Sequence, residues 1–183
     1  MHEPDDKPLI QYVRAGMEKA CKEFTARASP LGFQRTKKTI WTRRNPHTVD
    51  FISFFRKGSS YGAPRTASVQ IRLHLGIRVL NDGFTALATN GPTSDADILN
   101  KGRYHLRFNG ISGDTFDRCS DDLVRFVREQ GEPWFRKFAL TDNLISRADS
   151  PLKANVKTLL KQALDGSPNL ENVAKSLQLL GIK

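Results

Sequence analysis

The stretch VQIRLHLGIRV, residues 69–79, decides the fold class of this chain. Hydrophobic residues occupy every second position in it, and the positions between them hold Gln70, Arg72, His74, Gly76 and Arg78. Successive side chains of a β-strand point to opposite faces of the sheet, so this alternation predicts a strand with one buried and one polar face. Antiparallel sheets commonly bury one face and leave the other in water. We therefore expect this strand to belong to an antiparallel sheet.

Further segments have the composition of strands. Residues 33–44 and 48–57 are rich in Phe, Ile, Val, Thr and Trp, and the turn sequence Asn45-Pro46-His47 separates them, which predicts a hairpin. Residues 103–108 alternate in the same way as residues 69–79. Together these segments predict an antiparallel sheet of about four strands.

Apolar residues with helical spacing precede and follow the strands. They recur every three or four positions over residues 7–28 and again over residues 114–130. In the tail, Ser150-Pro151 and Ser167-Pro168 each introduce a similar pattern, and Ser followed by Pro is a typical helix start. We expect an α+β fold with an N-terminal helix and with the C-terminal helices packed on one face of the sheet.

The length of 183 residues suits one domain with a sizeable core. We place a single α+β domain at residues 1–140 and expect residues 141–183 to form a helical hairpin that docks on it. The oligomeric state stays open, because two short amphipathic helices can pack on a second copy as readily as on their own sheet.

Composition argues against several classes of protein. No run approaches the roughly 18 apolar residues of a membrane span, and the amino terminus, MHEPDDKPLI, is acidic where a signal peptide would be basic and then apolar. Cys21 and Cys119 fall on apolar positions of predicted helices, which favours buried free thiols over a disulfide or a metal site. These features predict a cytoplasmic protein with no membrane contact.

The positive charge is concentrated in the middle of the chain. The formal net charge is +10, and residues 31–110 hold thirteen Lys and Arg against four Asp and Glu, whereas the segments on either side are nearly balanced. A localised surplus of this kind is typical of a surface that meets a polyanionic partner.

Part of this surplus lies on the polar faces of two predicted strands. If the strands at residues 69–79 and 103–108 are neighbours, they form a basic patch suited to phosphate, carboxylate or nucleic-acid backbone. We take as the candidate anion-binding site Arg72, His74, Arg78, Arg103, His105 and Arg107. Few aromatic residues are expected on the same face, so no stacking platform for bases is evident. The alternative is a polar face that is simply solvated, as is common in antiparallel sheets.

The order of several short features resembles a known family. A first helix is followed by Leu31-Gly32-Phe33, a basic strand ending near Trp41, a Phe-rich strand and an alternating strand ending in Leu75-Gly76-Ile77. This order, over most of residues 9–140, resembles the domain of unknown function family 4304. The resemblance implies a compact bacterial-type α+β domain without an established activity, so it supplies no catalytic or binding residue. The helical tail after about residue 141 is not part of the family pattern.

Three functions fit the basic patch. The first is a binding module that contacts an acidic protein or another anionic partner through its sheet. The second is weak, sequence-independent binding of nucleic acid by the same charges. The third is a hydrolase or transferase that uses His74 or His105. Walker, GxGxxG, HExxH and CxxC motifs are missing, so we name no catalytic residue, metal site or cofactor and favour a binding protein over an enzyme.

Overall fold

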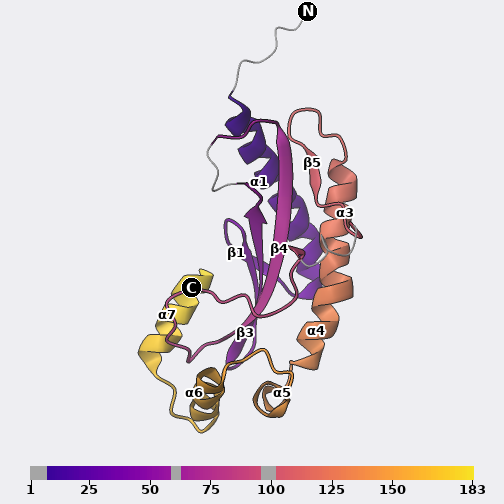
Figure 1. Ribbon diagram of the computed structural model, residues 1–183. Helices are drawn as coiled ribbons and strands as arrows, with labels where there is room; N and C mark the ends of the chain where they lie inside the picture. Colours follow the sequence, from indigo (N-terminus) through magenta and orange to yellow (C-terminus); the bar gives the residue numbers. More distant parts are fainter. Residues whose placement is uncertain (1–7, 59–62, 96–101) are drawn as a thin grey trace, which may run out of the picture.

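The computed structural model describes residues 8–58, 63–95 and 102–183. It confirms the α+β fold, with an N-terminal helix, a five-stranded antiparallel sheet and C-terminal helices (Figure 1). The strands follow one another in space in chain order: β1 (Gln34–Lys37), β2 (Ile40–Arg44), β3 (Thr48–Arg56), β4 (Ser68–Val79) and β5 (Arg107–Asn109). As expected, a hairpin joins β2 and β3, and the N–H of Asn45 donates to the carbonyl of Thr48 in its turn.

The fifth strand arises because residues 33–44 form two strands instead of one. The pairing of β1 with β2 places Lys37 opposite Ile40, so the chain reverses within Lys38 and Thr39. Arg35 stabilises this reversal, since its Nε donates to the carbonyl of Lys38 over 3.0 Å. The run of β-forming residues hid this turn, which contains neither Gly nor Pro.

Strand β4 is paired along both of its edges. One edge pairs with β3 over the whole of that strand. On the other edge, β5 pairs at Val69, and the carbonyl of Leu106 accepts from the N–H of Ile71. Residues 91–94 then continue this edge, with the N–H of Leu75 donating to the carbonyl of Pro92 over 3.0 Å. The expected strand at 103–108 is therefore wrong in its extent, because residues 91–94 hold the edge that it would need.

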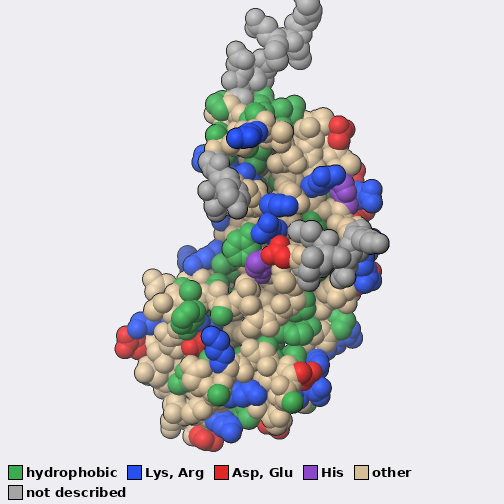
Figure 2. All heavy atoms as spheres, viewed as in Figure 1, with side chains coloured by type: hydrophobic (Ala, Val, Ile, Leu, Met, Phe, Trp, Pro, Cys, Tyr) green, Lys and Arg blue, Asp and Glu red, His purple; other side chains and the backbone are tan. Residues whose placement is uncertain are grey.

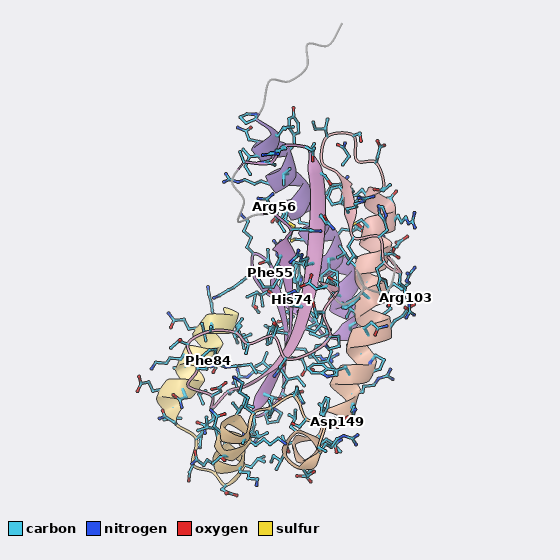
Figure 3. All side chains as sticks on the ribbon, in the orientation of Figure 1. Phe55, Arg56, His74, Phe84, Arg103 and Asp149 are labelled. Atoms are coloured by element: carbon cyan, nitrogen blue, oxygen red, sulfur yellow. The ribbon has the colours of Figure 1, made fainter. Side chains whose placement is uncertain are left out.

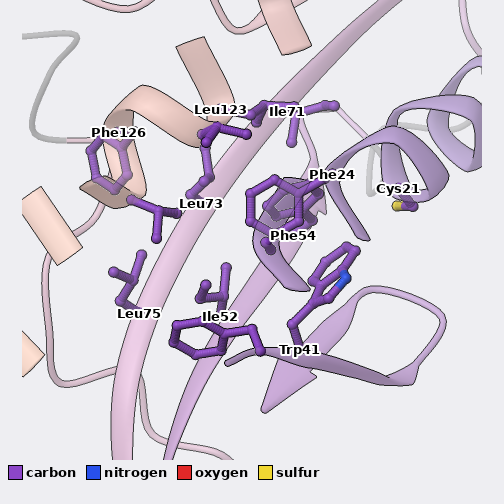
Figure 4. Packing of buried hydrophobic residues seen from close by; sticks show 14 of the residues in the cluster. Cys21, Phe24, Trp41, Ile52, Phe54, Ile71, Leu73, Leu75, Leu123 and Phe126 are labelled. Atoms are coloured by element: carbon purple, nitrogen blue, oxygen red, sulfur yellow. The ribbon is translucent and has the colours of Figure 1, made fainter. Parts of the chain in front are cut away.

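One face of the sheet, the first face, carries the main core. It buries the alternating apolar residues of β4 as predicted: Val69, Ile71, Leu73, Leu75, Ile77 and Val79. Helix α1 (Leu9–Ala28) lies against this face, and Gly16 lets it approach so closely that a Cβ there would stand 2.9 Å from a methyl group of Val69. Phe24, Trp41 and Phe54 pack together in this core, with ring centroids 4.5–4.9 Å apart (Figure 4). Trp41 is thus a packing residue, and its Nε1 donates to Thr25 Oγ1.

The helical region after β5 is longer than expected. Helix α3 (Phe116–Phe126) continues through one π-helical turn, η2 (Val127–Gly131), into α4 (Glu132–Lys137). The expected helix stop at Gly131 is wrong, because this glycine has helical geometry. A Cβ at Gly131 would lie 2.6 Å from Leu75 Cδ2, so the glycine serves close packing of the helix on β4.

The remaining helices, α5 (Thr141–Ser146), α6 (Ala154–Leu164) and α7 (Leu170–Leu180), are divided between the faces of the sheet. Leu144 of α5 and Leu160 of α6 belong to the main core. Helix α7 packs on the opposite face, the second face, where Leu180 joins Val49 and Phe51 of β3 in a smaller core. This division leaves α7 covering one end of the second face.

Asn81, just after β4, ties both tail helices to the sheet. Its side-chain amide donates to the carbonyl of Leu159 in α6 over 2.8 Å, and its side-chain oxygen accepts from the N–H of Asn169 over 2.6 Å. Asn169 in turn is the N-cap of α7 and accepts from two N–H groups of the first turn. The tail is therefore fixed to the end of β4 by hydrogen bonds as well as by apolar contacts.

The cysteine prediction is confirmed: Cys21 and Cys119 are free and buried. Burial raises the pKa of the Cys21 thiol to about 11 and that of Cys119 to about 12, so both stay protonated and unreactive at neutral pH. No helix in the described part of the chain is long and apolar enough to cross a membrane.

Candidate functional site

The second face of the sheet has a covered half and an open half. The covered half lies under α7 and includes Val49, Phe51, Gly76 and Arg78. The open half consists of the second-face residues of β3, β4 and β5 that α7 does not reach: Phe55, Gln70, Arg72, His74 and Arg107. Figure 1 looks onto this face, and β4 passes in front of α1.

A cavity of about 350 Å³ lies beside the open half and brings three of the predicted residues together. Arg72 reaches it from β4, Arg107 from β5, and His105 from the segment just before β5. Gln70, Ser94 and Tyr104 add neutral polar groups to the same wall. Two guanidinium groups and one imidazole thus face one hollow, which is a donor set suited to a phosphate or a carboxylate.

Asp95 provides a carboxylate next to these cations. Its Oδ1 lies 3.3 Å from Arg72 Nε, and its Oδ2 lies 2.8 Å from His74 Nε2. Asp95 reaches this place because the preceding residues are bound to β4: Thr93 bridges to His74, and the N–H of Ser94 donates to the carbonyl of Leu73. One carboxylate therefore orients two of the predicted residues without fully offsetting their charge.

Three buried polar atoms around the cavity make no hydrogen bond within the described residues. His105 Nε2 and Arg72 Nε are buried and make no hydrogen bond to any residue that the structure describes. The same holds for Asp95 Oδ1, although it stays within ion-pair distance of Arg72. Arg72 Nε and Asp95 Oδ1 are 3.3 Å apart and pair with each other, so among these three atoms His105 Nε2 is the one without a partner in the described part of the chain, and buried polar groups usually have one.

Arg103 lies apart from this cavity. Its guanidinium donates to Glu129 over 2.7 Å, and the hydroxyl of Tyr104 donates to the same carboxylate over 2.8 Å. The hydrogen bond from Tyr104, together with the charges of Arg103 and Arg125, lowers the pKa of Glu129. Figure 3 shows Arg103 beside the α3–α4 helical segment and well away from His74. Arg103 therefore pairs with the helical segment on the surface and does not line the cavity.

Arg78 corrects the expectation that all six residues are displayed on an open face. Only 3% of Arg78 is exposed, because α7 covers its part of the sheet. Its guanidinium donates to the carbonyls of Asp82, Phe84 and Ala86 and to Ser176 Oγ of α7. Every nitrogen of this side chain is used inside the protein, so Arg78 holds the loop after β4 and the last helix in place.

Phe55 is a site residue that the sequence did not reveal. It pairs with Arg72 across β3 and β4, so its ring stands on the open half, where 46% of the residue is exposed. The ring lies against the imidazole of His74, with centroids 4.8 Å apart (Figure 3). One exposed aromatic ring therefore stands on the face where few aromatic residues were expected. Strand β3 is apolar on both faces, which hid the exposure of this one ring.

The two imidazoles proposed for catalysis do not share the cavity. His105 lines it, whereas His74 contacts Asp95 and Phe55. Within the described ranges, no group of three or more His, Cys, Asp or Glu residues is arranged to hold a metal ion. The arrangement provides cationic and polar donors around a hollow, which suits binding of an anion.

Comparison of the chain with protein-family models, with curated proteins and with solved structures gave no match. The resemblance to the domain of unknown function family 4304 stays a prediction, and the function has to be argued from the site itself.

Proposed function

We propose that this chain is a binding module that holds an oxyanion group of an anionic partner in the cavity beside the open half of the sheet. The observation that carries the proposal is the convergence of Arg72, His105 and Arg107 on one hollow of about 350 Å³. A guanidinium offers parallel N–H donors that match the two oxygens of a carboxylate or phosphate. A partly enclosed site also screens such contacts less than an open surface does.

Two features support an external ligand over a solvated surface. His105 lines the cavity, and its buried Nε2 makes no hydrogen bond within the described residues, so a turn of the imidazole toward the cavity would let a bound oxygen satisfy it. Arg107 is exposed at the rim, and it faces the same cavity as Arg72. The acidic side chains of a protein and the phosphates of a nucleic acid both present the oxyanion group that this donor set fits.

The test uses a fluorescently labelled inorganic polyphosphate chain as the probe and fluorescence anisotropy of the full-length protein as the readout. Polyphosphate carries oxyanion groups without bases or peptide. The double variant Arg72→Ala/Arg107→Ala is compared with Arg14→Ala/Arg118→Ala, which removes the same charge from exposed positions of α1 and α3. We expect the cavity variant to bind at least about tenfold more weakly and the control to stay within about twofold of the unmodified chain. Equal losses in both variants, or no binding by the unmodified chain at low salt, would refute the proposal.

A further inference from the structure

The open half combines an exposed aromatic ring with the anion cavity. Phe55 is 46% exposed, so its ring presents an aromatic surface to solvent on this sheet face. Its ring is held by the His74 imidazole at a centroid distance of 4.8 Å, and His74 is held in turn by Asp95. The ring therefore stands on a supported surface and not on a free loop.

Ring and cations are close together because they occupy three neighbouring strands. Phe55 on β3 lies opposite Arg72 on β4, and Arg107 on β5 lies opposite Gln70, which is on the same face of β4. Neighbouring strands are about 4.8 Å apart and a strand rises about 3.4 Å per residue, so the backbone positions of Phe55 and Arg107 are about 12 Å apart, with Arg72 between β3 and β5. Figure 2 shows Lys and Arg side chains and a hydrophobic side chain next to one another in the middle of this face.

We propose that this surface binds single-stranded nucleic acid, with a base stacked on Phe55 and the neighbouring phosphates held by Arg72, His105 and Arg107. The inference rests on the proposed function and names the partner. Every base has a π-face that an aromatic side chain can cover, and a basic groove beside such a ring is the usual arrangement for sequence-tolerant single-strand binding. A duplex hides its base faces, and an acidic peptide would leave the ring of Phe55 unused.

Additional charge flanks the ring on its own strand. Lys57, two positions after Phe55, is exposed, whereas Arg56 pairs with Ile71 and its side chain points to the first face. Figure 3 places Arg56 just beyond Phe55 along β3. A strand of nucleic acid that stacks on the ring would meet Lys57 next to β3 as well as Arg72 on β4, which favours an extended polyanion over a single small anion.

The test measures anisotropy of a labelled oligo-dT of about 12 nucleotides alongside the labelled polyphosphate. Phe55→Ala should weaken binding of oligo-dT by about tenfold, because it removes the stacking surface, and should leave polyphosphate binding unchanged. Phe55→Trp should retain oligo-dT binding. Phe84→Ala is the matched control, since Phe84 is 56% exposed but lies beside α7, away from the site (Figure 3). It should leave both probes unaffected.

The outcomes separate the inference from the proposed function. Polyphosphate binding that depends on Arg72 and Arg107, with oligo-dT binding that Phe55→Ala does not change, would overturn the single-strand inference alone. Equal or tighter binding of duplex DNA or of poly-glutamate would also overturn it, and so would thymidine monophosphate binding as tightly as the oligonucleotide. If the unmodified chain does not bind polyphosphate at all, the proposed function is refuted, and the single-strand inference that rests on it is refuted as well.

Discussion

Two arginines on the same face of the same strand show how differently the halves of the sheet are used. Arg78 is buried under α7 with its nitrogens bonded to carbonyls and to Ser176, whereas Arg72 is partly exposed beside a cavity and, among the described residues, is paired with Asp95 alone. The two positions are equivalent in the alternation of β4. The difference comes from α7, which reaches one half of the face and not the other. An arginine on this face therefore has a structural role where a helix covers it, as for Arg78, and is available to a ligand where no helix covers it, as for Arg72.

The largest expected effect of a single change is in the covered half. Arg78→Met should destabilise the fold by about 3–5 kcal/mol, because it leaves three carbonyls and the Asp82 carboxylate without their buried cation. Arg72→Met, the matched change in the open half, should alter stability by no more than about 0.5 kcal/mol. Urea unfolding followed by circular dichroism measures both. Similar losses for the two variants would contradict the division of the face.

A smaller effect on stability is expected at Gly76, which contacts Phe51 in the smaller core under α7. A Cβ at Gly76 would lie 2.4 Å from the ring of Phe51, so Gly76→Ala should cost about 1–3 kcal/mol through overpacking. An alanine in a strand is otherwise more favourable than a glycine by about 0.5–1 kcal/mol. A thermal melt of Gly76→Ala beside Gln70→Ala, a change at an equivalent position of the open half, checks this. Stabilisation by Gly76→Ala would show that Phe51 can move without loss of the smaller core.

Asp95 makes it possible to change the open half without disturbing the fold. Asp95→Asn removes the carboxylate beside Arg72 and His74 while keeping a similar shape. We expect polyphosphate to bind more tightly by about 1 kcal/mol, the size of one charge interaction at about 4 Å in water, with stability nearly unchanged. Anisotropy at low salt measures the affinity. Weaker binding in the variant would mean that Asp95 acts mainly by holding Arg72 in position.

The local sequence pattern predicted the strands of the sheet, but it did not predict which polar side chains are exposed and which are buried. The alternation of residues 69–79 correctly predicts the buried face of β4, whereas the adjacency of the two basic segments was only a condition of the patch, and the structure meets it where Gln70 pairs with Arg107. Whether Arg78 is exposed depends on Ser176, which is 98 positions further along the chain, and no local period encodes such a contact. Phe55 was missed for a related reason: apolar residues on both faces of β3 give no sign of which one stays uncovered.

The smallest expected difference between the two halves of the second face is in how their variants change the salt dependence of oligo-dT binding. For single-stranded nucleic acid, the slope of log K against log salt changes by about 0.7 for each phosphate contact. Arg72→Ala and Arg107→Ala should therefore each lower the slope for oligo-dT by about this amount, and together by about twice as much. Arg78→Met, measured at a temperature where it remains folded, should leave the slope unchanged, because its charge does not reach the cavity. A lower slope in Arg78→Met would show that α7 moves away from the sheet when the ligand binds, so that the covered half joins the binding surface.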